Sequence, residues 1–256
     1  MRIEADLHTH THFSDGKGSI EENVLAARAK GLKRIAITDH GPGHLGFGIK
    51  RHQLKEMRAI VDILNRKYDD IEILLGLEAN ILNEDGDLDI DDELLEDLDI
   101  LLAGYHFGSS PKKWPRDITF HSNNWFKKRS KKIYEKAMAA NTKAFVNAMR
   151  RYDIDIITHP GAKGPLDIEA VAKVAEETHT AMEISASRHA YLTVEAIEIA
   201  RKYRVDFTVN SDAHVPEGIG EVEGGLERAE AAGISIESLL NNRADFPNRR
   251  GTRDEF

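Results

Sequence analysis

The feature that most constrains the fold of this 256-residue chain is a regular alternation of short apolar runs with longer amphipathic stretches. Seven runs rich in Ile, Val and Leu fit buried strands, and five longer stretches fit helices, so the pattern predicts repeated βα units. The predicted strands are residues 2–8, 34–40, 71–79, 98–106, 154–159, 180–185 and 205–214. The predicted helices are residues 19–30, 52–68, 124–151, 167–178 and 193–203.

Two of the predicted helices carry local start signals. Ser19 is a plausible N-cap, and Glu22 lies three residues beyond it, which is the spacing of a capping box. Gly31 is a suitable stop residue for the same helix. Asp167 is a plausible N-cap for the helix that follows it.

The length and composition favour one domain. No Pro-, Gly- or Ser-rich linker divides the chain, and a single α/β barrel commonly reaches this length. We predict one domain over residues 1–256, with a barrel over about 1–240 and a loosely packed tail over about 241–256. No apolar run approaches the roughly 18 residues that span a bilayer. No signal-peptide pattern is present at the N-terminus, so we expect a cytoplasmic protein with no membrane partner.

The composition limits the chemistry. The chain has no cysteine, which excludes disulfides, thiolate metal sites, iron–sulfur clusters and a cysteine nucleophile. Any metal must therefore be held by histidines and carboxylates. The net charge of −9 disfavours a broad nucleic-acid surface but leaves a local basic groove open. The basic run "KKRSKK" at 127–132 lies in a helical pattern and is predicted to be a solvated helix face.

Ligand-type side chains follow six of the seven predicted strands. Parallel strands assemble active sites at their C-terminal ends, so these side chains should converge at one mouth. With Asp15, nine residues are more than one tetrahedral ion can use, and two or three ions fit better. Two ions about 3.5 to 4 Å apart suit the hydrolysis of phosphate esters. The candidate ligands are His8, His10, Asp15, His40, Glu78, His106, His159, Asp212 and His214.

Six short motifs, taken in order, carry a family resemblance. The segments "DLHTHTHFSDG", "ITDHG", "GLEANI", "AGYHFG", "THPG" and "NSDAH" closely resemble the PHP (polymerase and histidinol phosphatase) superfamily. The resemblance runs from Asp6 to at least Leu240. Through "GLEANILNEDGDLD" and "ISASRH" the chain is most similar to the stand-alone phosphatase branch.

This resemblance implies a distorted (β/α)7 barrel, a TIM-like PHP fold, with a trinuclear centre of divalent ions at the C-terminal mouth. Zinc is the first expectation, with manganese or iron as alternatives. By resemblance, His8 and His10 match the HxH pair, Glu78 matches the bridging glutamate, and Asp15 falls where the family uses Asp or His. The remaining ligand motifs match His40, His106, His159, Asp212 and His214. His12 has no counterpart among the ligands, so we expect it at the surface or supporting a ligand.

Other residues are weaker candidates. "GPGHLGFG" after His40 is expected to form a flexible loop over the mouth, with His44 as a substrate contact in the catalytic site. Arg188 is the second catalytic candidate, because a guanidinium suits bidentate phosphate binding, although it could instead tie its loop to a carboxylate. Lys163 is a further candidate.

The acidic stretch at 83–97 invites comparison with a calcium-binding EF-hand loop. Its sixth position is Leu88 rather than Gly, and its twelfth is Leu94 rather than a bidentate Glu. We therefore predict a solvated acidic loop there.

The leading functional prediction is a metal-dependent phosphoesterase that hydrolyses a small phosphomonoester, histidinol-phosphatase-like, through a metal-activated water. The alternatives are a PHP-type exonuclease or nucleotide phosphodiesterase, an amidohydrolase-type enzyme, and a non-enzymatic metal-binding regulatory module. A small phosphorylated molecule is the expected partner, and the oligomeric state stays open.

Overall fold

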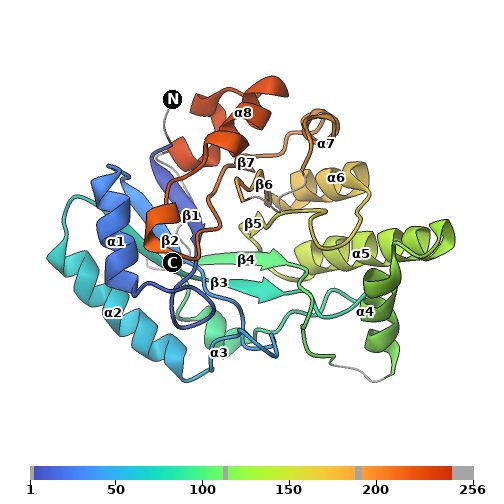
Figure 1. Cartoon of the computed structure of the whole chain (residues 1–256), viewed down its shortest axis with the longest axis horizontal. Helices are drawn as coiled ribbons and strands as arrows, with labels where there is room; N and C mark the ends of the chain where they lie inside the picture. The colour runs from blue at the N-terminus through green and yellow to red at the C-terminus, as the bar shows by residue number, and fades with distance from the viewer. Residues whose placement is uncertain (1–2, 112–114, 188–191, 244–256) are drawn as a thin grey trace.

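Seven parallel strands, hydrogen-bonded in chain order from β1 to β7, form a curled sheet that helices surround (Figure 1). The computed structural model describes residues 3–111, 115–187 and 192–243. The predicted distorted (β/α)7 barrel is confirmed. The strands are β1 (Ala5–Thr9), β2 (Arg34–Ile37), β3 (Glu72–Asn80), β4 (Ile100–Gly104), β5 (Ile156–Ile157), β6 (Ala181–Glu183) and β7 (Phe207–Thr208).

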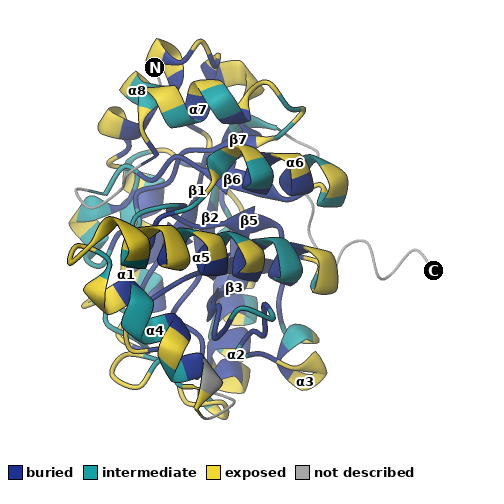
Figure 2. Cartoon of the chain, turned by 90° about the vertical axis from the view of Figure 1, so that its right-hand side faces the viewer, coloured by how far each residue is buried: buried dark blue, intermediate teal, exposed yellow. Residues whose placement is uncertain are grey.

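Helices α1 to α7 lie between successive strands in the chain, α8 follows β7, and the helices cover the outside of the sheet. Figure 2 shows buried strands inside and helices whose outer faces are exposed. No helix within the described residues is both long and apolar enough to cross a membrane. The helices are α1 (Ile20–Ala29), α2 (Gln53–Lys67), α3 (Asp92–Leu95), α4 (Arg116–Phe126), α5 (Lys131–Arg151), α6 (Ile168–Thr178), α7 (Val194–Ala200) and α8 (Glu223–Ala231), with 3-10 turns η1 (Pro216–Gly218), η2 (Ile236–Ser238) and η3 (Leu240–Asn242).

The predicted helix starts are confirmed at two places. Ser19 and Glu22 form a complete capping box at α1, and the Asp167 carboxylate accepts a hydrogen bond from the Ala170 N–H at the start of α6. The prediction of one helix over 124–151 was wrong. Ser130 ends its continuity, because its hydroxyl accepts from the Ile133 N–H and caps a new helix, α5, inside the basic run.

A β-bulge in β1 aims the first histidines into the barrel. Asp6 pairs with Ile35 and Thr9 pairs with Ile37, so β1 contains one more residue than β2 between these two pairs. Leu7 packs in the cluster inside the barrel, and the extra residue lets His8 face the same side, where it approaches Glu78. The simple alternation that the sequence predicts is thus locally broken at the site.

The seam between β7 and β1 is closed by side chains, since Asp6 accepts from the Ser211 N–H and hydroxyl, Asn210 accepts from the Leu7 N–H, and Asn241 bridges both strands. The His10 N–H donates to the Ala213 carbonyl at 2.9 Å near the mouth. Lower down, the Asn241 amide donates to the carbonyls of Ala5 (2.8 Å) and Val209 (2.9 Å) and accepts from the Val209 N–H (2.8 Å). Asn241 is 2% exposed, so the prediction that a loose tail begins at about 241 is wrong at this residue, which is part of the barrel.

The acidic segment after β3 is folded rather than solvated, which corrects the prediction. The Asp87 side chain is buried and lies 2.8 Å from Arg151. Asp89 accepts hydrogen bonds from the Asn80 backbone and amide and from the Gly43 N–H. Burial raises the pKa of Asp89 despite these bonds. This carboxyl group therefore ties the end of β3 to the loop after His40.

Candidate metal centre

All nine predicted ligands meet at the C-terminal mouth of the barrel. The structure brings their ligand atoms into three overlapping groups, each compact enough for one ion, and His159 and Asp212 lie against these groups. The groups are His10, Asp15, His40 and His214; His8, His10 and Glu78; and His40, Glu78 and His106.

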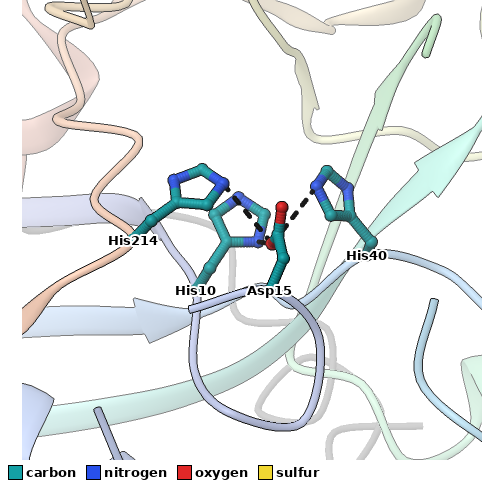
Figure 3. A group of neighbouring side chains, drawn as sticks. All are labelled: His10, Asp15, His40 and His214. Atoms are coloured by element: carbon teal, nitrogen blue, oxygen red, sulfur yellow. Dashed lines mark ion pairs between the residues drawn. The ribbon is translucent and has the colours of Figure 1, made fainter. Parts of the chain in front are cut away.

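Asp15 is the centre of the outermost group. Its Oδ1 lies 3.4 Å from His214 Nε2, 3.6 Å from His40 Nε2 and 3.9 Å from His10 Nδ1. Figure 3 shows the three imidazoles around this carboxylate. The loop that carries Asp15 is held by Asp39, which accepts hydrogen bonds from the Thr11 N–H and hydroxyl. The three histidines follow the C-terminal ends of β1, β2 and β7, so this group joins both sides of the seam.

Glu78 is the centre of the inner groups. Its Oε2 lies 3.0 Å from His40 Nδ1 and 3.4 Å from His8 Nε2. Its Oε1 lies 2.9 Å from His159 Nε2 and 3.2 Å from His106 Nε2. Each oxygen of this fully buried carboxylate therefore faces a different pair of imidazoles, which is the geometry of a bridging ligand.

The chemistry of these atoms fits divalent metal ions. His10 Nδ1, His40 Nδ1 and Glu78 Oε2 are buried, and none makes a hydrogen bond, although the last two atoms lie 3.0 Å apart. Leaving them without a partner would be costly if they bound nothing. Two Nε2 atoms, of His8 and His10, face each other at 3.1 Å. Ligands about 2.0 to 2.1 Å from a tetrahedral zinc lie about 3.3 Å from one another, close to these separations. The site is therefore suited to ions held by nitrogen and oxygen.

The electrostatics of the chain alone also favour bound cations. Burial would raise the pKa of Glu78, but His106, His8 and His159 hold it well below its ordinary value, so the carboxylate is ionised. Burial lowers the pKa of His106 to about 3, and burial with the nearby His40 lowers that of His10. These two imidazoles are neutral at neutral pH, which is the form that binds a metal.

Two other ligands hold protons in the metal-free chain. Burial opposes the charge on His8, but Glu183, Glu78 and Asp212 outweigh it and raise the pKa of His8 well above its ordinary value. Burial likewise opposes the charge on His214, but Asp15 and Asp212 raise its pKa to about 9. Ions that bind these imidazoles must displace the protons.

Supporting residues that the sequence did not reveal orient the ligands. Glu183 accepts from the His159 N–H at 2.6 Å, and its other oxygen lies 2.8 Å from His8 Nδ1, which leaves His8 Nε2 free for a metal. The Oδ1 of the Asn80 side-chain amide lies 2.9 Å from His106 Nδ1 and orients this imidazole in the same way. Thr158 donates to Glu78 at 2.6 Å. Glu183 is the charged residue within the apolar run 180–185, and a charge inside a buried strand could have indicated a role at the site.

Two ligands have unusual backbone conformations. His159 has a φ of 28° and Asp212 a φ of 54°, a region that residues other than glycine seldom adopt. Such conformations persist where the surrounding structure imposes them, and they cluster at functional sites. His159 lies two residues past β5 and Asp212 four residues past β7, so both lie in segments beyond the C-terminal ends of the strands.

A pocket of 180 Å³ lies above the ligands. His44 and Lys163 both line it. His44 Nε2 lies 2.9 Å from the Phe107 carbonyl, and its Nδ1 accepts from the Phe47 N–H at 3.1 Å, so both ring nitrogens already hold the loop together. Arg188 lies outside the described residues. His12 is exposed and stacks on Phe13, as expected for a residue outside the ligand set.

Comparisons with known proteins agree with this geometry. The family model described as "PHP domain" matches residues 6–187, and one described as "PHP-associated" matches residues 194–241. A "Probable phosphatase" of Shewanella frigidimarina (strain NCIMB 400) is 34% identical, over 100% of this chain and 98% of its own length. Another "Probable phosphatase", of Thermoanaerobacter sp. (strain X514), is 35% identical, over 94% of this chain and 91% of its own.

A solved structure shares the fold. It is the histidinol phosphate phosphatase of Lactococcus lactis, complexed with zinc, L-histidinol and phosphate. Its TM-score is 0.62 at 16% sequence identity, with 92% of this chain and 95% of that chain covered. At this identity the likeness concerns the arrangement of the barrel.

Proposed function

Since this chain belongs to the PHP domain family, we propose that it is a metal-dependent phosphoesterase that hydrolyses small phosphomonoesters. The observation that carries the proposal is the convergence of nine nitrogen and oxygen ligands beneath a pocket of 180 Å³. Relatives named probable phosphatases, which match the chain over nearly their whole length, support the same reaction class.

We propose three divalent ions, with zinc as the first choice and manganese or iron as alternatives. Three overlapping ligand groups support the number. A set rich in imidazole supports zinc or another transition metal over magnesium, which prefers oxygen ligands. Glu78 and Asp212 would balance the charge of cations held close together.

The residues of this chain would bind and orient the phosphate ester. Divalent ions bound at the mouth would polarise the phosphoryl oxygens and lower the pKa of a bound water. Lys163 lines the same pocket and would offer its ammonium group to a phosphoryl oxygen. Arg188 is proposed in a similar role from the sequence alone. His44 would shape the pocket wall, and its role as a direct substrate contact stays a prediction.

The net charge favours a small substrate over a nucleic acid. The chain carries a net charge of −9, which suits the binding of one terminal phosphate by cations at the mouth better than the tracking of a long phosphate backbone. In the basic run, Lys127 is partly buried and donates to the Lys163 carbonyl, whereas Lys128, Arg129, Lys131 and Lys132 are exposed, as predicted for a solvated helix face. A PHP-type exonuclease is the second candidate.

The test is a screen of the purified protein, loaded with zinc, manganese or iron, against phosphomonoesters, cyclic phosphodiesters and short oligonucleotides. We expect the highest kcat/KM for a small phosphomonoester, little dependence on salt, loss of activity on chelation, and two or three ions per chain by elemental analysis. At most one ion, with no further uptake on titration, would contradict the multinuclear centre. A preference for oligonucleotides with a steep salt dependence would favour the exonuclease.

A further inference from the structure

A second, apolar pocket of 380 Å³ lies beside the metal mouth. Large apolar side chains from the loop after His40, the end of β4 and helix α4 line it, among them Leu45, Tyr105, Phe107, Trp125 and Phe126. Small-molecule pockets commonly span about 300 to 1,000 Å³, so this one can hold an aromatic ring or a short alkyl chain.

The rings of this pocket are already ordered. Phe107 and Trp125 meet edge to face, with centroids 6.0 Å apart, and Tyr105 meets Phe107 in the same way at 5.7 Å. The Tyr105 hydroxyl lies 3.3 Å from His121 Nδ1, so the polar end of this ring has a partner. Yet Trp125 is 71% exposed and Leu45 is 76% exposed. A preformed apolar surface left open to solvent marks a binding site.

The apolar pocket and the metal mouth share a wall. Phe107 lines both cavities, and it directly follows the candidate ligand His106. Leu45 follows His44, and its N–H donates to the Gly108 carbonyl at 3.0 Å, which holds the two wall segments together. A molecule whose phosphoryl group lies in the mouth would therefore present its ester substituent to Phe107 and the apolar pocket.

We propose that this pocket binds an apolar leaving group, so that the substrates are phosphomonoesters of an aromatic or bulky alkyl alcohol. The proposal rests on the function proposed above, because it requires the phosphoryl group to occupy the mouth. In the reaction, water oxygen bonds to phosphorus, the ester P–O bond breaks, and the alcohol leaves with a proton that derives from the water. Trp125, Tyr105 and Phe107 would select the alcohol by the apolar area they cover.

The test compares two esters with similar leaving-group chemistry, ethyl phosphate and 2-phenylethyl phosphate. We expect kcat/KM to be at least about tenfold higher for the phenylethyl ester. Trp125→Ala should lower this ratio about fivefold or more. Tyr134→Ala is the matched control, because Tyr134 is an exposed aromatic residue of α5 and is not among the described residues that line the pocket. It should leave the ratio unchanged.

A binding measurement separates this proposal from the reaction itself. Calorimetry of the metal-loaded protein should give a Kd at least about tenfold lower for 2-phenylethylphosphonate than for ethylphosphonate. Turnover of both esters with equal kcat/KM, unchanged by Trp125→Ala, would overturn the pocket proposal and leave the phosphoesterase standing. Selective phosphonate binding without turnover of any ester would support the pocket and overturn the phosphoesterase. Loss of self-association in Trp125→Ala with unchanged selectivity would assign this face to a second copy and overturn the proposal.

Discussion

At the scale of single residues, two carboxylates determine whether so many imidazoles can share one mouth. Glu78 is fully buried and presents an oxygen to each of two pairs of histidines. Asp212 Oδ1 lies 3.3 Å from His10 Nε2 and 3.6 Å from His8 Nε2. Without these negative charges, closely spaced cations would repel each other with little compensation.

The first prediction concerns these two residues. Glu78→Gln and Asp212→Asn keep the shape of each side chain but remove the charge, so both variants should lose most bound metal and at least about 100-fold in kcat/KM. Elemental analysis and far-UV circular dichroism should show metal loss with the fold retained. His12→Ala, at an exposed histidine, is the control and should remain active. Normal metal content in either variant would contradict the bridging roles.

The second prediction concerns a supporting residue. Glu183→Gln should weaken metal affinity by about 10- to 100-fold, because the carboxylate fixes the ring of His8 and the backbone of His159. Competition with a chelator would measure the change. Glu176→Gln, at a surface ion pair with Arg204, is the matched control and should bind metal normally. Equal affinity in both variants would show that Glu183 does not orient the ligands.

The third prediction is a pH dependence of the metal-free protein. Asp15 and Asp212 raise the pKa of His214 to about 9 in the fold, against 6.5 for the unconstrained residue. The protonated form is therefore the one that the fold stabilises. This contribution is complete below about pH 6.5 and disappears as the pH rises to about 9, so Tm should fall over this range. In His214→Gln the fall should be smaller, and an identical pH profile would contradict the assignment.

At the scale of helices and strands, local signals account for some boundaries and not for others. The sequence predicted the caps at Ser19, Glu22 and Asp167, because a capping side chain bonds within the first turn of its own helix. The break at Ser130 was missed, because the helical periodicity on its two sides looks continuous in sequence. The bulge in β1 was also missed, since the extra residue is visible only in its register with β2.

A prediction at this scale concerns the cap of α1. Ser19→Ala should lower the free energy of unfolding by about 1 kcal/mol, because the Glu22 N–H loses its acceptor. Urea denaturation would measure the change. Ser235→Ala is the matched control: Ser235 occupies the N-cap position of η2, but its side chain makes no capping hydrogen bond. A loss of equal size in both variants would mean that the capping box contributes nothing specific.

At the scale of the whole molecule, the sequence predicted the barrel and the convergence of its ligands but not how the barrel closes. The alternation of strands and helices implies a parallel sheet, and parallel strands place their C-terminal ends together. The closure depends partly on Asn241, a polar residue in a segment whose composition indicated a loose tail. Asn241 bonds to backbone atoms of Ala5 and Val209. Such contacts could not be predicted from the sequence, because every residue carries the same backbone groups.

The last prediction tests this closure. Asn241→Ala leaves the buried carbonyls of Ala5 and Val209 and the Val209 N–H without their partner. We expect a loss of about 2 to 4 kcal/mol in the free energy of unfolding, together with faster amide hydrogen exchange along β1 and β7. Asn123→Ala, at a partly buried asparagine on α4, is the control. Unchanged exchange at β1 would contradict the role of Asn241 at the seam.

The position of the metal centre across this seam has a consequence for the order of folding. His8 and Asp212 lie 3.6 Å apart in space but about 200 residues apart along the chain, so their contact is among the least local in the molecule. A nascent chain that has emerged only as far as β6 already holds the two inner ligand groups, but it lacks Asp212 and His214. The outermost group therefore matures last, after the final strand leaves the ribosome, and chains arrested before that point would bind metal without the native geometry.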